Sequence, residues 1–211
     1  MEREVYNLDK IDFSHINYKK MNEYVRIRYN NSRLMLRTPL LRVSYIDVGD
    51  KIIKIKLFIN NENDKEYNFG KKLVNLDKFI FNGAKENSNW FDGVNYDYVG
   101  LINDNELMLK FKKSDNIKIK CNGEVIDIKE LKKNYLVKVI FDVSGLFINS
   151  NKFGIYLKPY LIDINVDYIF YESEDEIIKD YLIDGKYSLS SSENDNNYEK
   201  KDLENNIEMN I

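Results

Sequence analysis

Apolar and polar residues alternate along much of the chain up to residue 166. In the segment Tyr24–Tyr29, for example, Val25 and Ile27 alternate with Arg26 and Arg28, as expected of a strand with one buried face. Short runs of this kind, separated by Gly, Asn and Asp, predict a mostly-β domain. The expected strands cover residues 24–29, 34–36, 41–48, 52–59, 107–112, 117–121, 124–128, 135–143 and 153–166.

Two segments depart from this alternation. Between residues 69 and 84 the apolar positions recur mostly at three- and four-residue steps, which predicts one inserted helix ending near Gly83. Residues 87–105 are rich in Asn, Asp and Gly around Trp90 and Phe91, which predicts a long loop with an aromatic anchor.

Turn residues separate the expected strands. Asn122-Gly123 is a strong hairpin signal, because both residues accept the positive φ angles of a tight turn. Gly49-Asp50 predicts a turn between two neighbouring strands, and Ser144-Gly145 predicts another between the last two.

The length of 211 residues suits one domain with a tail. We expect an N-terminal extension over residues 1–21, the β-domain over 22–171 and an acidic, largely disordered tail over 172–211. The tail holds 12 acidic and 4 basic residues, a net charge of −8, whereas the preceding residues carry 28 basic and 23 acidic residues, a net of +5. A basic body with an acidic tail is typical of a protein that binds a polyanion.

Residue types needed for most catalysis are scarce. His15 is the single histidine and Cys121 the single cysteine, so a histidine-dependent triad or a cysteine-rich zinc site can hardly form. No glycine-rich phosphate loop is present, and we interpret Asp92, Asp97 and Asp104 as turn formers. We therefore expect no enzyme activity, no cofactor and no metal, although carboxylate-only Mg²⁺ chemistry stays open.

The N-terminal sequence lacks the pattern of a secretory signal, and no apolar run approaches the roughly 20 residues that span a bilayer. A single cysteine also gives no reason for an oxidising compartment. We expect an intracellular protein that is not secreted and has no membrane partner.

Basic residues two positions apart recur in four of the expected strands, with apolar residues between or beside them. Period two places each basic pair on one face of its strand and the apolar residues on the other. A single pair of this kind only solvates a sheet, but four pairs with few acidic residues between them indicate a surface for a phosphate backbone. The pairs are Arg26/Arg28, Lys54/Lys56, Lys110/Lys112 and Lys118/Lys120.

Proteins that bind single strands add aromatic rings on which bases stack. Trp90 and Phe91 are the strongest candidates, together with Tyr96 and Tyr98, because they lie in a polar loop. Further candidates lie in or beside the strands, where most aromatic residues are core residues. These are Tyr24, Tyr29, Tyr45, Phe58, Phe147 and Tyr156.

Three stretches resemble a known family. They are Leu34–Pro39 (LMLRTP), the Trp90-Phe91 loop, and Val137–Phe147 (VKVIFDVSGLF) followed by Lys152–Ile155. Together they resemble the single-stranded DNA-binding proteins of large DNA viruses, a group similar to phage replication proteins with an OB barrel and an acidic tail. The family usually has Trp at Phe147 and a glutamine near Lys158-Pro159-Tyr160, so both positions depart from its pattern.

The resemblance implies an OB-like Greek-key barrel that binds single-stranded DNA without sequence preference in viral replication, recombination or repair. Arg37, within the first stretch, joins the basic pairs, Trp90 and Phe91 as an expected nucleic-acid contact. The tail would compete for the same surface and recruit replication proteins, and the protein would lie in the host cytoplasm or nucleus. Homo-oligomers, a preference for RNA, a scaffolding virion protein and a metal-dependent nuclease accessory stay open as alternatives.

Overall fold

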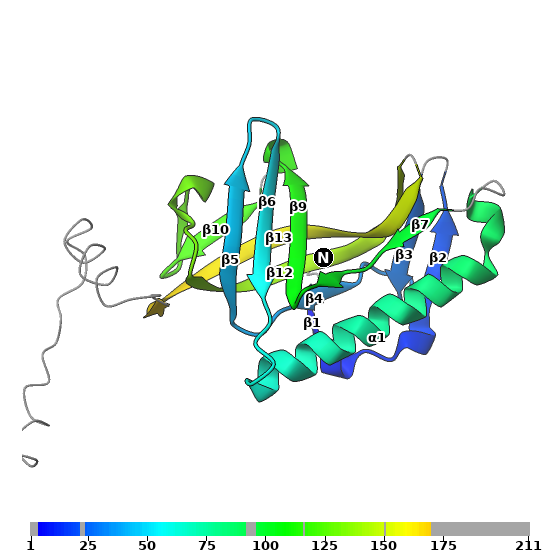
Figure 1. The fold of residues 1–211 in the computed structure, drawn as a ribbon, viewed down its shortest axis with the longest axis horizontal. Coiled ribbons are helices and arrows are strands. Elements are labelled where there is room, and N and C mark those ends of the chain that lie inside the picture. The colour runs from blue at the N-terminus through cyan, green and yellow to red at the C-terminus, as the bar shows by residue number, and fades with distance from the viewer. Residues whose placement is uncertain (1–3, 22–23, 92–95, 116, 150, 170–211) are drawn as a thin grey trace, which may run out of the picture. The chain divides into compact units, whose positions relative to one another are not determined.

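Two long antiparallel strands, β12 (Tyr135–Asn149) and β13 (Lys152–Ile169), form the centre of the sheet (Figure 1). The computed structural model describes residues 4–21, 24–91, 96–115, 117–149 and 151–169. The predicted tail, residues 172–211, lies outside the described residues.

The other strands pair around this central hairpin in the order β11-β10-β13-β12-β5-β6-β9-β8, with β3 and β4 also on β12. The two ends of this path, β11 and β8, do not pair with each other in the described residues, so the sheet is open. The mostly-β class with one inserted helix is confirmed. The strands are β1 (Tyr6–Asn7), β2 (Ile16–Lys20), β3 (Val25–Tyr29), β4 (Met35–Arg37), β5 (Leu41–Val48), β6 (Ile52–Phe58), β7 (Asp97–Val99), β8 (Ile102–Asn103), β9 (Glu106–Lys112), β10 (Lys118–Cys121) and β11 (Glu124–Ile126).

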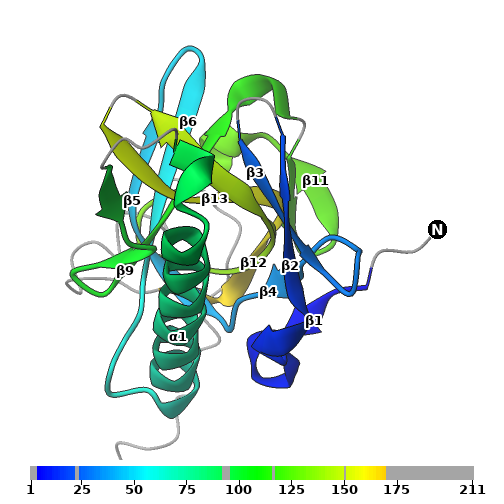
Figure 2. The same cartoon turned by 90° about the vertical axis from the view of Figure 1, so that its right-hand side faces the viewer.

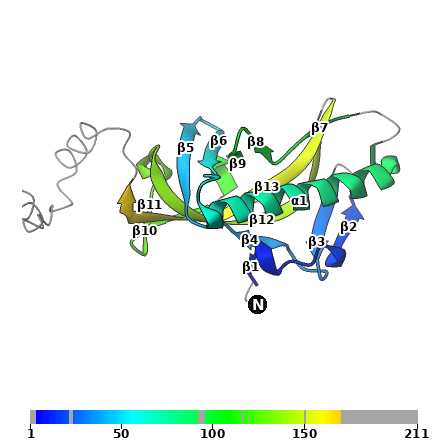
Figure 3. The same ribbon diagram turned by 60° about the horizontal axis from the view of Figure 1, so that its bottom comes forward.

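The helix α1 (Asp64–Glu86) lies between the β6–β9 strands and the β2–β3 hairpin (Figure 2; Figure 3). It is longer than the predicted helix at both ends. At its start, the Asn63 side chain accepts from the backbone N–H groups of Lys65 and Glu66, a cap that apolar periodicity does not reveal. Its buried face consists of Phe69, Gly70, Leu73, Leu76, Ile80 and Ala84.

The prediction that the helix ends near Gly83 is wrong. Gly83 lies inside α1 because the ring of Tyr18 from β2 packs directly against it, leaving no room for a side chain. The glycine thus serves a close approach between helix and strand rather than a helix end.

The central strand β12 continues through the predicted turn at Ser144-Gly145. A Cβ atom at Gly145 would clash with the carbonyl oxygen of Val25, so the glycine lets β3 cross close over β12. The register shifts between Val143 and Gly145, which is a β-bulge rather than a chain reversal.

Three tight hairpins have two consecutive residues with positive φ. Asn122 and Gly123, with φ of 52° and 84°, join β10 to β11 as predicted. Asn30-Asn31 does the same after β3, and Asp104-Asn105 joins β8 to β9. Asp104 is therefore a turn former, as predicted.

The described part of the expected N-terminal extension contributes strands to the sheet. β1 pairs with β4, β2 pairs with β3, and the Phe13 ring lies 5.7 Å from that of Phe79 on α1. The division of the chain into three parts stays a prediction. Within the described residues, no helix is both long and apolar enough to cross a membrane.

Candidate nucleic-acid interface

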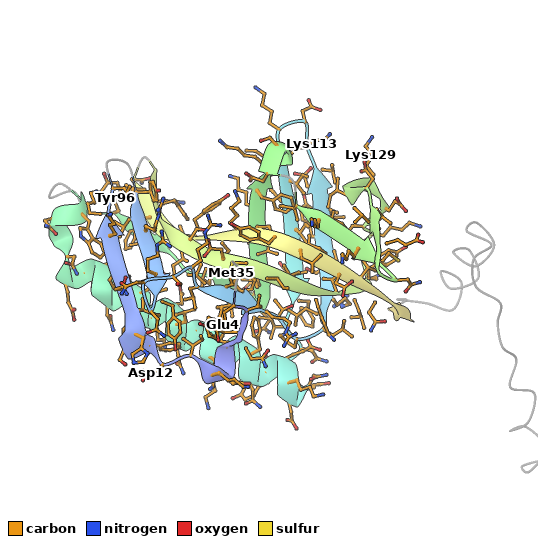
Figure 4. The ribbon with its side chains drawn as sticks, turned by 180° about the vertical axis from the view of Figure 1, so that it is seen from behind. Glu4, Asp12, Met35, Tyr96, Lys113 and Lys129 are labelled. Atoms are coloured by element: carbon orange, nitrogen blue, oxygen red, sulfur yellow. The ribbon has the colours of Figure 1, made fainter. Side chains whose placement is uncertain are left out.

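The register of the central strands places a set of polar and cationic side chains on one outer face. Cross-strand partners share a face of a sheet, so each row of partners is a row of neighbouring side chains. Figure 4 shows this side of the molecule, with Met35 of β4 near its centre. The rows are Arg26–Gly145–Tyr156, Met35–Asp142–Lys158, Arg37–Ile140–Leu161–Lys118 and Lys138–Asp163–Lys120.

A groove of about 420 Å³ is hollowed into this face. It combines four cationic side chains with four aromatic rings, and the rest of its lining comes from Ile27 of β3 and from Asp142, Ser144, Gly145 and Leu146 of β12. Asp142 is 6% exposed, so the positive charges dominate the accessible surface of the groove. The cations are Arg26, Arg28, Arg33 and Lys158, and the aromatic residues are Tyr24, Phe147, Tyr156 and Tyr160.

Tyrosines hold two of the groove arginines. The Arg26 guanidinium donates to the Tyr24 hydroxyl at 2.6 Å and lies 5.7 Å from the centre of that ring. Arg33 donates to the Tyr160 hydroxyl, with its guanidinium 5.8 Å from the ring centre. Each pair presents a planar cation beside a flat ring, which suits a phosphate beside a stacked base.

The fourth groove cation, Lys158, pairs with Asp115 at an Nζ–Oδ1 distance of 3.3 Å. Asp115 lies in the turn after β9, and its other oxygen accepts from the Lys112 backbone N–H at 2.9 Å. Burial raises the pKa of the nearby Tyr156, and the Asp115 charge raises it further. The hydroxyl of Tyr156 therefore stays protonated at neutral pH and remains a hydrogen-bond donor.

A second cationic surface lies on the outer side of β5, β6 and β9, and we call it the lysine face. Lys54 faces Lys110 across the strands, and Lys112 faces Ile52. Tyr45 is 45% exposed here, and the Lys56 amine lies 5.8 Å from its ring centre. The predicted residues Lys54, Lys56, Lys110 and Lys112 thus lie together.

Acidic residues are more prominent on the lysine face than the sequence suggested. Asp47 lies 3.2 Å from Lys54, and Glu106 lies 2.6 Å from Lys56. Hydrogen bonds from Lys56 and Ser44 lower the pKa of Glu106, so its charge persists at neutral pH. Strand pairing places Asp47 and Glu106 beside the lysines of β6, and the alternation within single strands does not reveal these neighbours. Lys110 and Lys112 are exposed and form no ion pair with another described residue.

The other predicted cations lie on the same outer face as the groove. Arg37 and Lys118 belong to one cross-strand row, and Lys120 lies beside Asp163 in the next. Arg37 also donates to the Asn7 side chain at 3.1 Å. The structure therefore gathers Arg26, Arg28, Arg37, Lys118 and Lys120 on one face, with the lysine face as a separate group.

The expectation that Trp90 offers an exposed stacking ring is corrected by its burial. Trp90 is 8% exposed, and its ring lies 5.3 Å from that of Tyr18. Its carbonyl accepts from the Lys20 amine at 2.7 Å. The loop is also shorter than predicted, because Ser88–Phe91 forms a 3-10 turn and β7 and β8 follow. The Phe91 side chain lies outside the described structure.

Sequence reasoning missed Arg33, Lys158 and Tyr160 as site residues. Tyr156 and Lys158 are two apart in β13 and therefore share a face, so the period-two rule applied to this strand would have found Lys158. Arg33 lies between the Asn30-Asn31 turn and β4, outside any strand, so the period-two rule does not apply to it. Among the residues that the structure describes, no group of three or more His, Cys, Asp or Glu could hold a metal ion.

Comparisons with known proteins find similar folds but no similar sequences. No protein-family model matches the chain, and no curated protein matches it. The structure of gp2.5, a single-stranded DNA-binding protein of bacteriophage T7, is 12% identical, with a TM-score of 0.49 over 75% of this chain and 97% of that chain.

A single-stranded DNA-binding protein from bacteriophage Enc34 also matches. Its structure in complex with single-stranded DNA is 12% identical, with a TM-score of 0.45 over 75% of this chain and 98% of that one. A second structure is 13% identical, with a TM-score of 0.46 over 79% and 98%. These structures are those of phage single-stranded DNA-binding proteins.

Proposed function

We propose that this protein binds single-stranded DNA without sequence preference. The observation that carries the proposal is the groove, in which Arg26, Arg28, Arg33 and Lys158 lie among four aromatic rings. Cations that follow a backbone and rings that stack on bases are the two elements of single-strand recognition. A duplex hides the faces of its bases, so rings in the groove favour an unpaired strand.

The groove residues suit contacts with the phosphate backbone and with the faces of the bases rather than with the base edges. Arginine and lysine bind any phosphate, and every base has a face on which a tyrosine can stack. We therefore expect little sequence preference. Such binding suits a protein that covers single strands during viral DNA replication, recombination or repair, with the acidic tail as the segment that contacts replication proteins.

The lysine face extends the proposed contact surface. Lys112 lies at the end of β9, and its backbone N–H donates to Asp115, which pairs with the groove residue Lys158. Figure 4 shows Lys113 just beyond this end of β9. The proposed contacts are thus Arg26, Arg28, Arg33, Arg37, Lys118, Lys120 and Lys158 on the groove side, with Lys54, Lys56, Lys110 and Lys112 on the lysine face.

Fluorescence anisotropy of a labelled oligo(dT) at several salt concentrations tests the proposal. We expect affinity to fall with salt by about 0.7 logarithmic units per phosphate contact for each tenfold increase in salt. An Arg26→Gln/Arg33→Gln variant should lower that slope by about 1.4, because it removes two such contacts. Its matched control is Lys71→Gln/Lys78→Gln, which removes two exposed charges from α1.

Two outcomes of this experiment would rule out the groove as the binding site. If the wild-type chain shows no salt-dependent binding, or if the groove and control variants lose equal affinity, the groove is not the binding site. Self-association without oligonucleotide binding would instead favour the scaffolding alternative. A labelled oligo(U) in the same assay compares RNA with DNA.

A further inference from the structure

The ion pair between Lys158 and Asp115 lies where the two cationic surfaces meet. Lys158 lines the groove from β13, whereas Asp115 follows the end of β9, the strand that carries Lys110 and Lys112. The exposed fraction of the side chain is 33% for Lys158 and 17% for Asp115. A single DNA strand that contacted both the groove and the lysine face would pass this carboxylate.

Asp115 occupies the position that a phosphate oxygen would take at Lys158. Its Oδ1 atom lies 3.3 Å from the Lys158 amine, and its Oδ2 atom is held by the Lys112 N–H at 2.9 Å. Each carboxylate oxygen thus accepts from a charged amine or a backbone N–H, as the oxygens of a bound phosphate would. Two of the other groove cations, Arg26 and Arg33, contact tyrosine hydroxyls, which carry no charge to exchange with a phosphate.

We propose that Asp115 is an internal competitor of the bound strand: it neutralises Lys158 in the free protein and is displaced from the amine by a backbone phosphate. This inference rests on the proposed function of the groove. A carboxylate that stays near a phosphate repels it, so the exchange lowers affinity and makes release easier. Asp115 thereby weakens binding at the junction while its bond to Lys112 keeps the end of β9 in place.

The test uses the variant Asp115→Asn. Its amide keeps an oxygen that can accept from the Lys112 N–H, but it carries no negative charge. Anisotropy with a labelled dT16 should show binding about 2- to 5-fold tighter than wild type, the size expected from one partly exposed charge pair. The salt slope should become steeper by up to about 0.7, because in the wild type the displaced Asp115 carboxylate takes up a cation, which offsets the counterion that the DNA releases when its phosphate binds Lys158. The matched control is Glu62→Gln, which removes an exposed charge at the opposite end of the β6–β9 pair.

A double-mutant cycle with Lys158→Gln separates competition from a general charge effect. In the Lys158→Gln background, Asp115→Asn should no longer steepen the salt slope, because the cation for which the two anions compete is gone. A thermal melt of each variant shows whether the fold is intact.

Three outcomes overturn the inference. The first is that Asp115→Asn binds dT16 no tighter than wild type, and the second is that the control Glu62→Gln gains as much affinity as Asp115→Asn. The third is that Asp115→Asn steepens the salt slope as much in the Lys158→Gln background as in the wild type. A wild-type chain that fails to bind dT16 at low salt would instead overturn the proposed function itself, so the two failures are distinguishable.

Discussion

Arg33 and Tyr160, 127 residues apart in the chain, form one unit of the groove: the Arg33 guanidinium donates to the Tyr160 hydroxyl and lies 5.8 Å from the centre of its ring. The hydroxyl orients the cation, and the cation lies beside a ring that a base can cover. The ring and the hydroxyl of Tyr160 therefore have different roles, which two substitutions can test separately.

Tyr160→Ala should weaken oligo(dT) binding by about 5- to 150-fold, because it removes one stacking ring worth about 1 to 3 kcal/mol. Tyr160→Phe keeps the ring and removes the hydroxyl that accepts from Arg33, so the loss of affinity should be much smaller. Anisotropy titrations measure both, with Tyr67→Ala, an exposed ring on α1, as the control. Equal losses in the alanine and phenylalanine variants would contradict a stacking role for the ring.

The single tryptophan should report on folding and not on DNA contact. Trp90 is buried against Tyr18, so its emission maximum should remain that of a buried indole when oligo(dT) saturates the protein. Urea should shift this maximum to longer wavelength. Strong quenching by the oligonucleotide under native conditions would place Trp90 in the interface and contradict its burial.

Gly145→Ala should lower the free energy of unfolding by about 1 to 3 kcal/mol, because the added Cβ meets the Val25 carbonyl oxygen and forces β3 away from β12. Since β3 carries Arg26 and Arg28, binding should weaken as well. Urea unfolding followed by Trp90 emission measures the stability. Ser144→Ala, next in the chain and free of this clash, should cost much less, and similar losses in both variants would exclude the clash as the cause.

Tyr98→Phe should destabilise the fold more at pH 7 than at pH 4. Burial raises the pKa of Asp77 on α1, while hydrogen bonds from the Tyr98 hydroxyl and the Leu101 N–H partly lower it. Without the hydroxyl the folded pKa rises further above that of the unfolded chain. The folded state then binds more protons than the unfolded state in this window, so stability falls as pH rises.

At pH 7 the expected loss of stability is about 1 to 3 kcal/mol, the cost of leaving a partly buried carboxylate without one of its donors. Urea unfolding at the two pH values measures it, and Tyr45→Phe on the exposed lysine face is the control. A loss that is independent of pH would show that the Asp77 charge is not involved.

Removal of residues 172–211 should tighten DNA binding at low salt. The segment carries a net charge of −8 and the rest of the chain +5, so we expect the tail to compete with phosphate for the same cations. The difference should shrink as salt screens the charges. Anisotropy with the full and shortened chains measures the effect, and weaker binding by the shortened chain would refute competition by the tail.

Local pattern was sufficient for several elements of this fold, whereas β1, β2, β7 and β8 were not predicted. Alternation over 24–29, 41–48 and 52–59 predicted β3, β5 and β6, because one buried face imposes period two on a strand wherever it lies. Asn122-Gly123 predicted its hairpin because positive φ depends on the residues themselves. Gly145 was misread as a turn, since the close approach of Val25 that requires a glycine comes from a strand more than a hundred residues away.

The sequence by itself determined which strands carry cations and that one face of each is apolar. Only the tertiary structure decided which of those faces adjoin, because strand pairing and bulges are set by packing between distant segments. Arg26 and Arg28 meet Arg33, Lys158 and Tyr160 through pairing with β12 and β13, whereas the lysines of β6 and β9 meet Asp47 and Glu106. Burial of Trp90 was likewise a property of the packed core, which no local pattern records.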